Sequence, residues 1–169
     1  HLFFFFLGKS DQVTLEALRQ AGGIAFSKMT SEEIFDLALD ADLFFPSINH
    51  PEVDPLSGLA SLIEGFLLAA YQFDSYKSKV THQSIQLKIC SRSKEFKSVW
   101  KELHRSLEAT RTSIQLARDW SNHPSNIGTP EYYASEAKKW AKLNGISCKI
   151  LSESEIKKEE MGLFSAVGQ

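Results

Sequence analysis

The stretch ARDWSNHPSNIGTPEYYASEAKKWAKLNGI, residues 117–146, contains a helix end, a polar loop and the start of a second helix. Pro124 disfavours helix at His123, because a residue that precedes proline is pushed out of the α region. Thr129 and Pro130 then have the residue types of a helix N-cap and a first helical position. Such a junction is typical of a boundary between two α/β domains.

The segments on either side of this junction continue an α/β pattern. Before it, residues 94–122 are predicted to form one long helix with an apolar stripe. After it, the new helix is predicted to close at Asn144 and Gly145. The alternating run ISCKIL at 146–151 favours a strand, and Ser152 is a possible cap for a short helix.

Further upstream, strands and helices alternate. The apolar residues 2–6 predict a buried strand, and a helix follows from about Thr14, where Gly22 and Gly23 either weaken the helix or mark a close approach. The segment EEIFDLALDADLFFP favours a strand that ends at Pro46, although the pattern leaves a helix open. After a proline-rich loop at 46–55, a strongly apolar helix is predicted from Ser57, and a strand at 84–90.

Composition excludes several classes of protein. With 169 residues, of which 43% are hydrophobic and 24% charged, the chain is suited to a packed core rather than to disorder. A net charge of -2 indicates no overall attraction to nucleic acid or to an anionic membrane. The two cysteines, Cys90 and Cys148, form no metal-binding or disulfide pattern, which favours a reducing cytoplasm.

Four groups of residues invite a chemical role, and each has a plainer structural interpretation that we favour. The acidic group lacks a metal-binding motif and is predicted to be a solvated face and loop. The run LGKS at 7–10 lacks the glycine of a P-loop, since that position is Phe3. Cys148 is predicted to be a small core residue, and His123 a polar loop residue. The acidic group with its neighbouring histidine comprises Asp36, Asp40, Asp42, His50, Glu52 and Asp54.

Two surface features remain as alternatives. Aromatic residues at helical spacing suggest core or interface rather than a base-stacking surface. A local excess of basic residues offers contacts to phosphates, although such runs are usually solvated helix faces. The aromatic residues are Phe96, Trp100, Trp120, Tyr132, Tyr133 and Trp140, and the basic ones are Lys77, Lys79, Lys88, Arg92, Lys94, Lys97, Lys101 and Arg105, against Glu95 and Glu102.

The hinge pattern ARD..N.P.N..TPE at 117–131 and the closing MG...AVGQ at 161–169 resemble the segment that enters the catalytic domain of the leucyl aminopeptidase (cytosol aminopeptidase) family. The upstream runs LGK, TLEALRQAGG and YQFDSYKSK resemble the family's amino-terminal domain. The resemblance implies an α/β fold in which residues 1–122 form a macro-domain-like amino-terminal domain, a mixed sheet flanked by helices with a long linker helix. Residues 123–169 would then begin the catalytic domain.

The resemblance also implies a function. The family consists of hexameric, cytoplasmic exopeptidases that use two divalent metal ions, zinc, manganese or magnesium, to release amino-terminal residues from peptides, with leucine preferred. The family's metal ligands and catalytic residues come after the position of Gln169, so no residue here is assigned a catalytic, cofactor-binding or metal-binding role. The chain looks cut at both ends, with the family's first strands missing, and we expect it to be inactive by itself. The alternative is a DNA-binding or oligomer-assembly module without peptidase activity.

Overall fold

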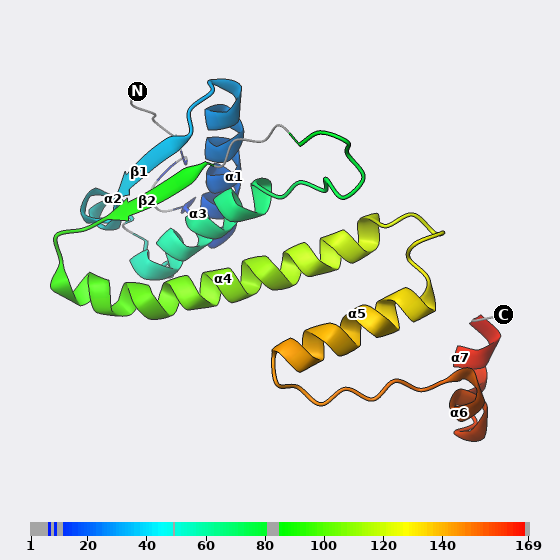
Figure 1. Ribbon diagram of the computed structural model, residues 1–169. Helices are drawn as coiled ribbons and strands as arrows, with labels where there is room; N and C mark the ends of the chain where they lie inside the picture. The colour runs from blue at the N-terminus through cyan, green and yellow to red at the C-terminus, as the bar shows by residue number, and fades with distance from the viewer. Residues whose placement is uncertain (1–6, 8, 10–11, 49, 81–84, 168–169) are drawn as a thin grey trace. The chain divides into compact units, whose positions relative to one another are not determined.

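The computed structural model describes residues 7, 9, 12–48, 50–80 and 85–167, and it divides into two compact units, His1–Arg118 and Asp119–Gln169. The structure is mixed α/β and mostly helical, with a small sheet of two parallel strands in the part of the chain that it describes. Figure 1 shows the elements in chain order. The strand predicted at 2–6 lies outside the described residues.

The first unit is built on strands β1 (Asp36–Asp40) and β2 (Gln86–Cys90), which pair in parallel with Leu37 opposite Leu87. The alternation predicted for β2 is confirmed, because Leu87 and Ile89 are half-buried while Gln86, Lys88 and Cys90 are exposed. The apolar face of the sheet packs against helices, and Lys88 on the opposite face pairs with Asp36 at 2.8 Å.

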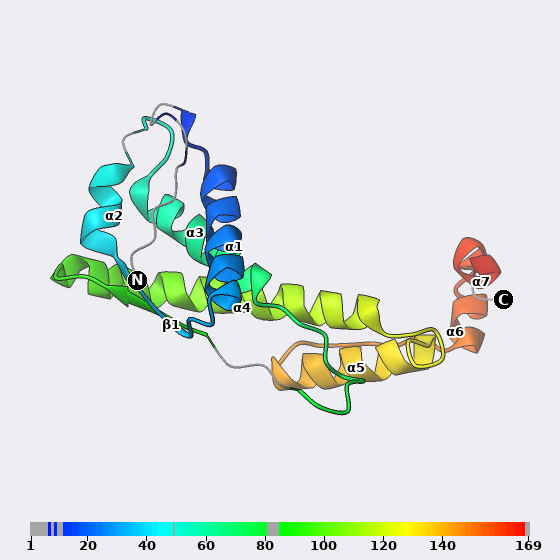
Figure 2. The ribbon, with the colours of Figure 1, turned by 90° about the horizontal axis from the view of Figure 1, so that it is seen from above.

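Two helices cross closely within this unit. Helix α1 (Leu15–Ser31) begins at the predicted cap Thr14, whose side chain accepts a hydrogen bond from the Ala17 amide. Helix α3 (Pro55–Ala69) begins two residues before the predicted Ser57. Figures 1 and 2 show α1 and α3 side by side. A Cβ on Gly22 would lie 1.9 Å from the Leu62 carbonyl oxygen, so the close approach left open by the sequence is confirmed.

The prediction of a strand reaching Pro46 is wrong. The strand ends at Asp40, and helix α2 (Ala41–Ser47) follows with Pro46 inside it. The physical reason lies in Asp40, whose carboxylate accepts a hydrogen bond from the Asp42 amide at 2.9 Å and so starts the helix. A proline close to the end of a short helix removes only one of its few backbone hydrogen bonds.

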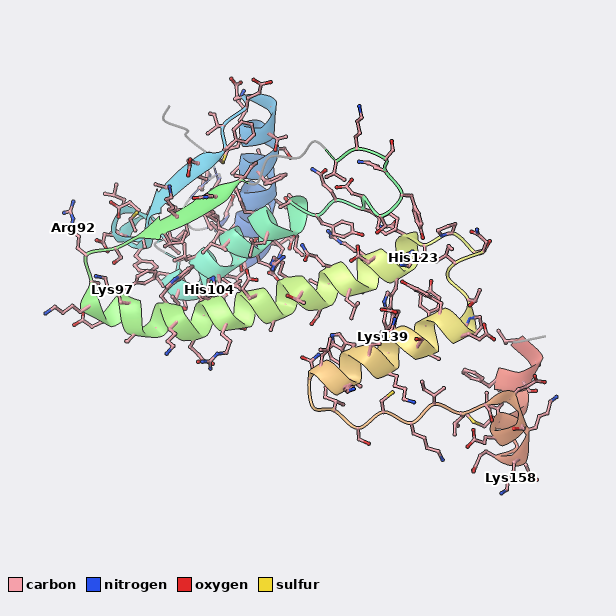
Figure 3. The ribbon with its side chains drawn as sticks, viewed as in Figure 1. Arg92, Lys97, His104, His123, Lys139 and Lys158 are labelled. Atoms are coloured by element: carbon pink, nitrogen blue, oxygen red, sulfur yellow. The ribbon has the colours of Figure 1, made fainter. Side chains whose placement is uncertain are left out.

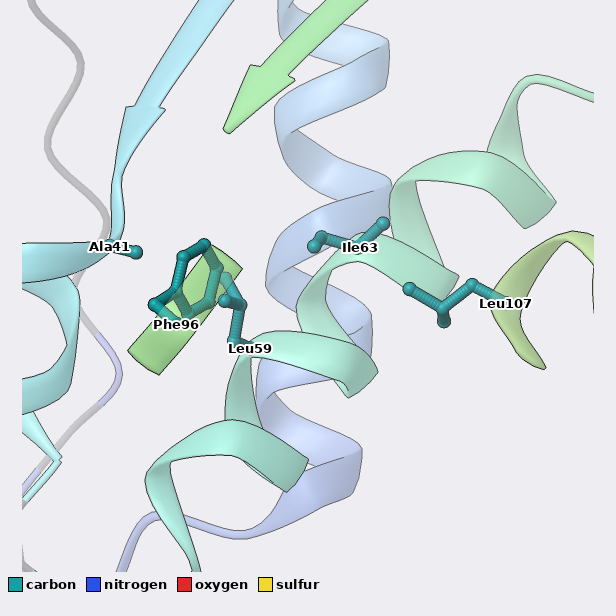
Figure 4. Close-up of a cluster of buried hydrophobic side chains, with 5 residues drawn as sticks. All are labelled: Ala41, Leu59, Ile63, Phe96 and Leu107. Atoms are coloured by element: carbon teal, nitrogen blue, oxygen red, sulfur yellow. The ribbon is translucent and has the colours of Figure 1, made fainter. Parts of the chain in front are cut away.

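The core of the first unit brings together residues distant in sequence. Helix α4 (Lys94–Asn122), predicted with these bounds, contributes the buried Phe96 and Leu107. They join Ala41, Leu59 and Ile63 in the cluster shown in Figure 4. Phe96 stacks on Trp100, which is half-buried against the same cluster. The prediction that these two aromatic residues serve the core is confirmed.

The second unit contains α5 (Pro130–Leu143), α6 (Glu153–Lys158) and α7 (Gly162–Val167). Thr129 caps α5, and Gly145 has a φ of 66° just after it, as predicted. Ser152 caps α6 in a reciprocal capping box with Glu155. The strand predicted at 146–151 is wrong for this structure, because that segment is irregular. Its alternation is present, but a strand also requires the backbone of a neighbour, and no described segment pairs with it.

Candidate functional site

The loop between α4 and α5 is held by its own backbone and by two tyrosines. The amides of Ile127 and Gly128 both donate to the Pro124 carbonyl, at 2.9 and 2.8 Å. The Tyr133 hydroxyl donates to the Trp120 carbonyl at 2.7 Å. A Cβ on Gly128 would lie 2.5 Å from that hydroxyl, so this glycine makes room for the tyrosine. The loop is therefore a specific, tightly closed turn.

His123 lies in this loop, immediately after α4, and is labelled in Figure 3. Its Nε2 atom lies 2.9 Å from the Tyr132 hydroxyl, and the two rings meet edge to face. The sequence singled out both residues but did not connect them, because they are nine positions apart across the turn. This pairing orients the imidazole and gives His123 a role in positioning the loop.

The acidic group predicted to be a solvated face is spread over several elements. Asp40 starts α2, and Asp54 caps α3 by accepting from the Ser57 amide at 2.9 Å. Asp42 accepts from the Ser91 hydroxyl at 2.6 Å and from the Arg92 amide at 2.8 Å. These two bonds lower the pKa of the Asp42 carboxyl, with the Ser91 contribution the larger. The carboxylates thus serve as helix caps and loop ties.

The family resemblance raises the question of a metal site. Within the described residues, no group of three or more histidine, cysteine or acidic side chains is arranged to hold a metal ion. His50, next to the acidic group, accepts a hydrogen bond from the Glu52 amide at its Nδ1 atom, 3.1 Å away. This donor set does not fit a pair of divalent cations.

Both cysteines are exposed. The prediction that Cys148 is a core residue is wrong, because it lies in the irregular segment at 146–151. A strand packed on a core would have buried it, and this segment is not paired in the described structure.

The basic excess forms a surface along the first half of α4. Lys94, Lys97, Lys101 and Arg105 recur at spacings of three and four residues, so they lie on one side of the helix, opposite Phe96. Figure 3 shows Arg92 and Lys97 at the beginning of this helix. Within the part of the chain that the structure describes, three of the eight basic residues form ion pairs, Lys77 with Asp74, Lys88 with Asp36, and Arg105 with Glu102. No ion pair joins Lys97 or Lys101 to a described residue.

A cavity of about 540 Å³ opens in the first unit between the end of α3 and the middle of α4. Arg111 lies in its wall, where its Nε and Nη2 atoms donate to Glu108 and its Nη1 atom donates to Gln115 at 2.8 Å. The Arg111 guanidinium lowers the pKa of the Glu108 carboxyl. This cluster was not among the residues predicted from the sequence, although a spacing of three and four residues along a predicted helix is a usable signal for it. Because Glu108, Arg111 and Gln115 bond to one another, their charges balance in this part of the cavity wall.

Two family models match the chain in succession. The model described as "Cytosol aminopeptidase family, N-terminal domain" matches residues 6–80, and "Cytosol aminopeptidase family, catalytic domain" matches residues 115–169. The second match begins just before the closed turn between α4 and α5. The chain belongs to the cytosol aminopeptidase family.

Curated relatives agree with this assignment to the cytosol aminopeptidase family. A probable cytosol aminopeptidase of Rhizobium etli (strain CIAT 652) is 31% identical over 169 residues, which cover 96% of this chain and 32% of that protein. The one of Rippkaea orientalis (strain PCC 8801 / RF-1) is 27% identical over 168 residues, which cover 96% of this chain and 31% of that protein. The chain therefore spans about a third of the length of these relatives.

Solved structures share the fold of this family member. The bottromycin maturation enzyme BotP superposes with a TM-score of 0.65 at 24% identity, over 90% of this chain and 30% of that chain. The same enzyme in complex with Mn superposes with a TM-score of 0.66 at 23% identity, again over 90% of this chain and 30% of that chain.

Among the described residues, none of the helices has the length and apolar run needed to cross a bilayer.

Proposed function

We propose that this chain is the amino-terminal portion of an aminopeptidase of the cytosol aminopeptidase family, which releases amino-terminal residues, leucine preferred, from peptides. The observation that carries this proposal is the order of the two matches, first the amino-terminal domain and then the catalytic domain, whose match begins at residue 115 within α4. A binding module that contained only one of the two domains would be expected to match only one of the family models.

The proposal includes a division of labour within the chain. Residues 1–122 would be a macro-domain-like domain with its linker helix, and residues 123–169 the beginning of the catalytic domain. The parallel pairing of β1 and β2, with helices over one face, supports such an α/β domain. The closed turn after α4 lies at the proposed beginning of the second domain.

The reaction would use two divalent cations, zinc, manganese or magnesium, which activate water and polarise the carbonyl of the first peptide bond. BotP has been solved with Mn, which makes manganese a good first choice in an assay. Because the described residues do not fit such a pair of ions, we derive no catalytic step from them. We expect the chain to be inactive by itself and the full enzyme to be a cytoplasmic hexamer.

A leucine amide reporter tests this proposal. We would compare the 169-residue chain with a chimera in which it continues into the part of the Rhizobium etli relative beyond the matched region, each with added manganese or zinc. Activity in the chimera alone is the expected result. Activity of the chain alone would show that it holds a complete metal site, and a folded but inactive chimera would count against the peptidase proposal.

A second candidate function is the binding of nucleic acid through the basic side of α4. Lys97 and Lys101 are exposed and form no ion pair with a described residue, so both are available to phosphates. Affinity for a DNA duplex should fall steeply with salt, by a slope of roughly 0.9 per phosphate contact on logarithmic axes. The double variant Lys97→Ala/Lys101→Ala should lower that slope by about 2, whereas Lys149→Ala/Lys158→Ala, two exposed lysines of the second unit, should leave it unchanged. No retention at low salt would reject this candidate.

A further inference from the structure

The cavity between the end of α3 and the middle of α4 has a broad apolar lining. Phe26 of α1, Leu67 of α3 and Ile85, the residue before β2, contribute to it. A smaller cavity of about 190 Å³ shares Leu67 and Ile85 with the first and is lined mainly by apolar residues, among them Phe66 and Leu107. The first cavity, at about 540 Å³, has the usual size of a small-molecule site, which combines such a lining with a few polar groups.

The polar groups that α4 contributes include hydrogen-bond donors that the described residues do not use. Arg111 directs the N–H on Nε and one on Nη2 to Glu108, and one on Nη1 to Gln115. A guanidinium has five N–H groups, so two of them have no acceptor in the described part of the chain. Gln115 accepts through its side-chain oxygen, and its NH₂ group forms no bond to a described residue. Donors of this kind bind carboxylate and carbonyl oxygens.

The same lining also carries negative charge. Asp74 and Glu108 contribute carboxylates, of which Asp74 pairs with Lys77 at 2.7 Å and Glu108 pairs with Arg111 at 2.6 Å. An ionised carboxylate offers about four lone-pair sites, so one that has a partner can also accept from an ammonium group. Gln72 adds a carboxamide, which can donate to a carbonyl and accept from an amide N–H.

We propose that this cavity is a binding site for short peptides that carry both charged termini and apolar side chains. The terminal carboxylate of such a peptide matches Arg111, and its ammonium group matches Asp74 and Glu108. Its peptide bond matches the carboxamides of Gln72 and Gln115. Its side chains match the apolar lining of the two neighbouring cavities.

Simpler ligands match this lining less well. An anion would meet one guanidinium, which is already paired, and two carboxylates. A purely apolar molecule would cover the remaining donors of Arg111 without bonding to them, which costs free energy. The inference goes beyond the proposed function, because the site lies within His1–Arg118 and needs neither a metal ion nor hydrolysis.

Calorimetric titration of the 169-residue chain with the dipeptide Leu-Leu tests this inference. We expect saturable binding of one peptide per chain. The acetylated and amidated form of Leu-Leu lacks both charges and should bind about tenfold more weakly, the loss of roughly one charge-assisted hydrogen bond. Equal affinity for the two forms, or no saturable binding of Leu-Leu at about 10 mM, would overturn the inference.

Substitutions on α4 locate the site. Arg111→Gln should weaken binding of Leu-Leu by about tenfold, because it removes the charged donors. Arg105→Gln is the matched control, since Arg105 also pairs with a glutamate three positions earlier, Glu102, and is not among the described residues that line the cavity. It should change the affinity less than about twofold. Equal losses in the two variants, or no loss in either, would contradict a site at this cavity.

Asp74→Asn supplies a second variant, which keeps the inference testable if Arg111→Gln does not fold. It should weaken binding of Leu-Leu but leave binding of acetylated Leu-Leu, which has no ammonium group, unchanged. An equal loss for both peptides would contradict the assignment of the ammonium group to this carboxylate.

The outcomes are separate from those of the peptidase proposal. Failure of the chain to bind Leu-Leu would remove this site and leave hydrolysis of leucine amide by the chimera as it was. An inactive chimera would remove the peptidase function, while saturable, charge-dependent binding of Leu-Leu by the chain would still support the site.

Discussion

At the scale of single residues, the crossing of α1 and α3 depends on two glycines. A Cβ on Gly22 would lie 1.9 Å from the Leu62 carbonyl oxygen, and one on Gly65 would lie 1.8 Å from the Arg19 carbonyl oxygen. Neither backbone can move without separating the helices. We therefore expect Gly22→Ala or Gly65→Ala to lower the free energy of unfolding by about 3 kcal/mol, as measured by urea denaturation.

Gly23 provides a matched control in the same helix. The nearest atom to its added Cβ would be 3.7 Å away, an ordinary contact. Since alanine favours helix over glycine, Gly23→Ala should leave stability unchanged or raise it by up to about 1 kcal/mol. A loss at Gly23 as large as that at Gly22 would refute the close-approach explanation.

Asp42 predicts a dependence of stability on pH. Its hydrogen bonds from Ser91 and Arg92 lower the pKa of the carboxyl in the folded state. A lowered pKa stabilises the fold above the ordinary value of about 3.9, and this stability disappears as the pH falls through the lowered pKa. Asp42→Asn should therefore reduce the urea midpoint at pH 7 and have a smaller effect at pH 3. The exposed Glu52, replaced in Glu52→Gln, is the control and should show little change at pH 7.

At the scale of elements, the cap of α5 can be tested in isolation. The Thr129 side chain accepts a hydrogen bond from the Tyr132 amide at 3.3 Å. Removing an N-cap of this kind costs about 1 kcal/mol, which corresponds to roughly fivefold faster amide exchange. We expect Thr129→Ala to speed exchange by that factor in the first turn of α5. Thr112→Ala, at an exposed position within α4, should leave exchange in α5 unchanged.

Element by element, the sequence predicted best what local chemistry determines. The bounds of α4 followed from its apolar stripe, and the cap of α5 followed from Thr129 and Pro130. Both signals are local, because they lie in or next to the element that they predict. Pro46 was misjudged because the capping carboxylate of Asp40 outweighed the proline. The segment 146–151 was misjudged because pairing depends on a distant partner, which no local pattern provides.

The residues of the candidate site show the same difference between features that are local in the sequence and contacts between distant residues. The acidic group was predicted to be a solvated face and loop, but Asp40 and Asp42 are half-buried, in β1 and α2. The hydrogen bonds that Asp42 accepts from Ser91 and Arg92 join residues 49 and 50 positions apart, so only the fold shows them. The pairing of His123 with Tyr132 required the turn to close first. Contacts of this kind form only when the tertiary structure brings distant residues together. Residue type therefore indicates which residues can take part in such a contact, but not which residues they pair with.

At the scale of the whole molecule, stability is distributed unevenly between the two units. Each cluster of buried hydrophobic residues found among the described residues, including Leu18, Met29 and Leu59, lies within His1–Arg118. Asp119–Gln169 buries a single hydrophobic side chain of those described, Ala141. Because cooperative unfolding requires a shared core, the two units should respond differently to heat.

The two units should therefore melt differently when they are separated. Residues 1–118 expressed alone should melt in one cooperative transition followed by circular dichroism, close to that of the whole chain. Residues 119–169 alone should lose helicity gradually, since caps and short helices without a core are marginal in water. A sharp transition in residues 119–169 would contradict this prediction, because it would mean that this unit has a core that buries more than Ala141.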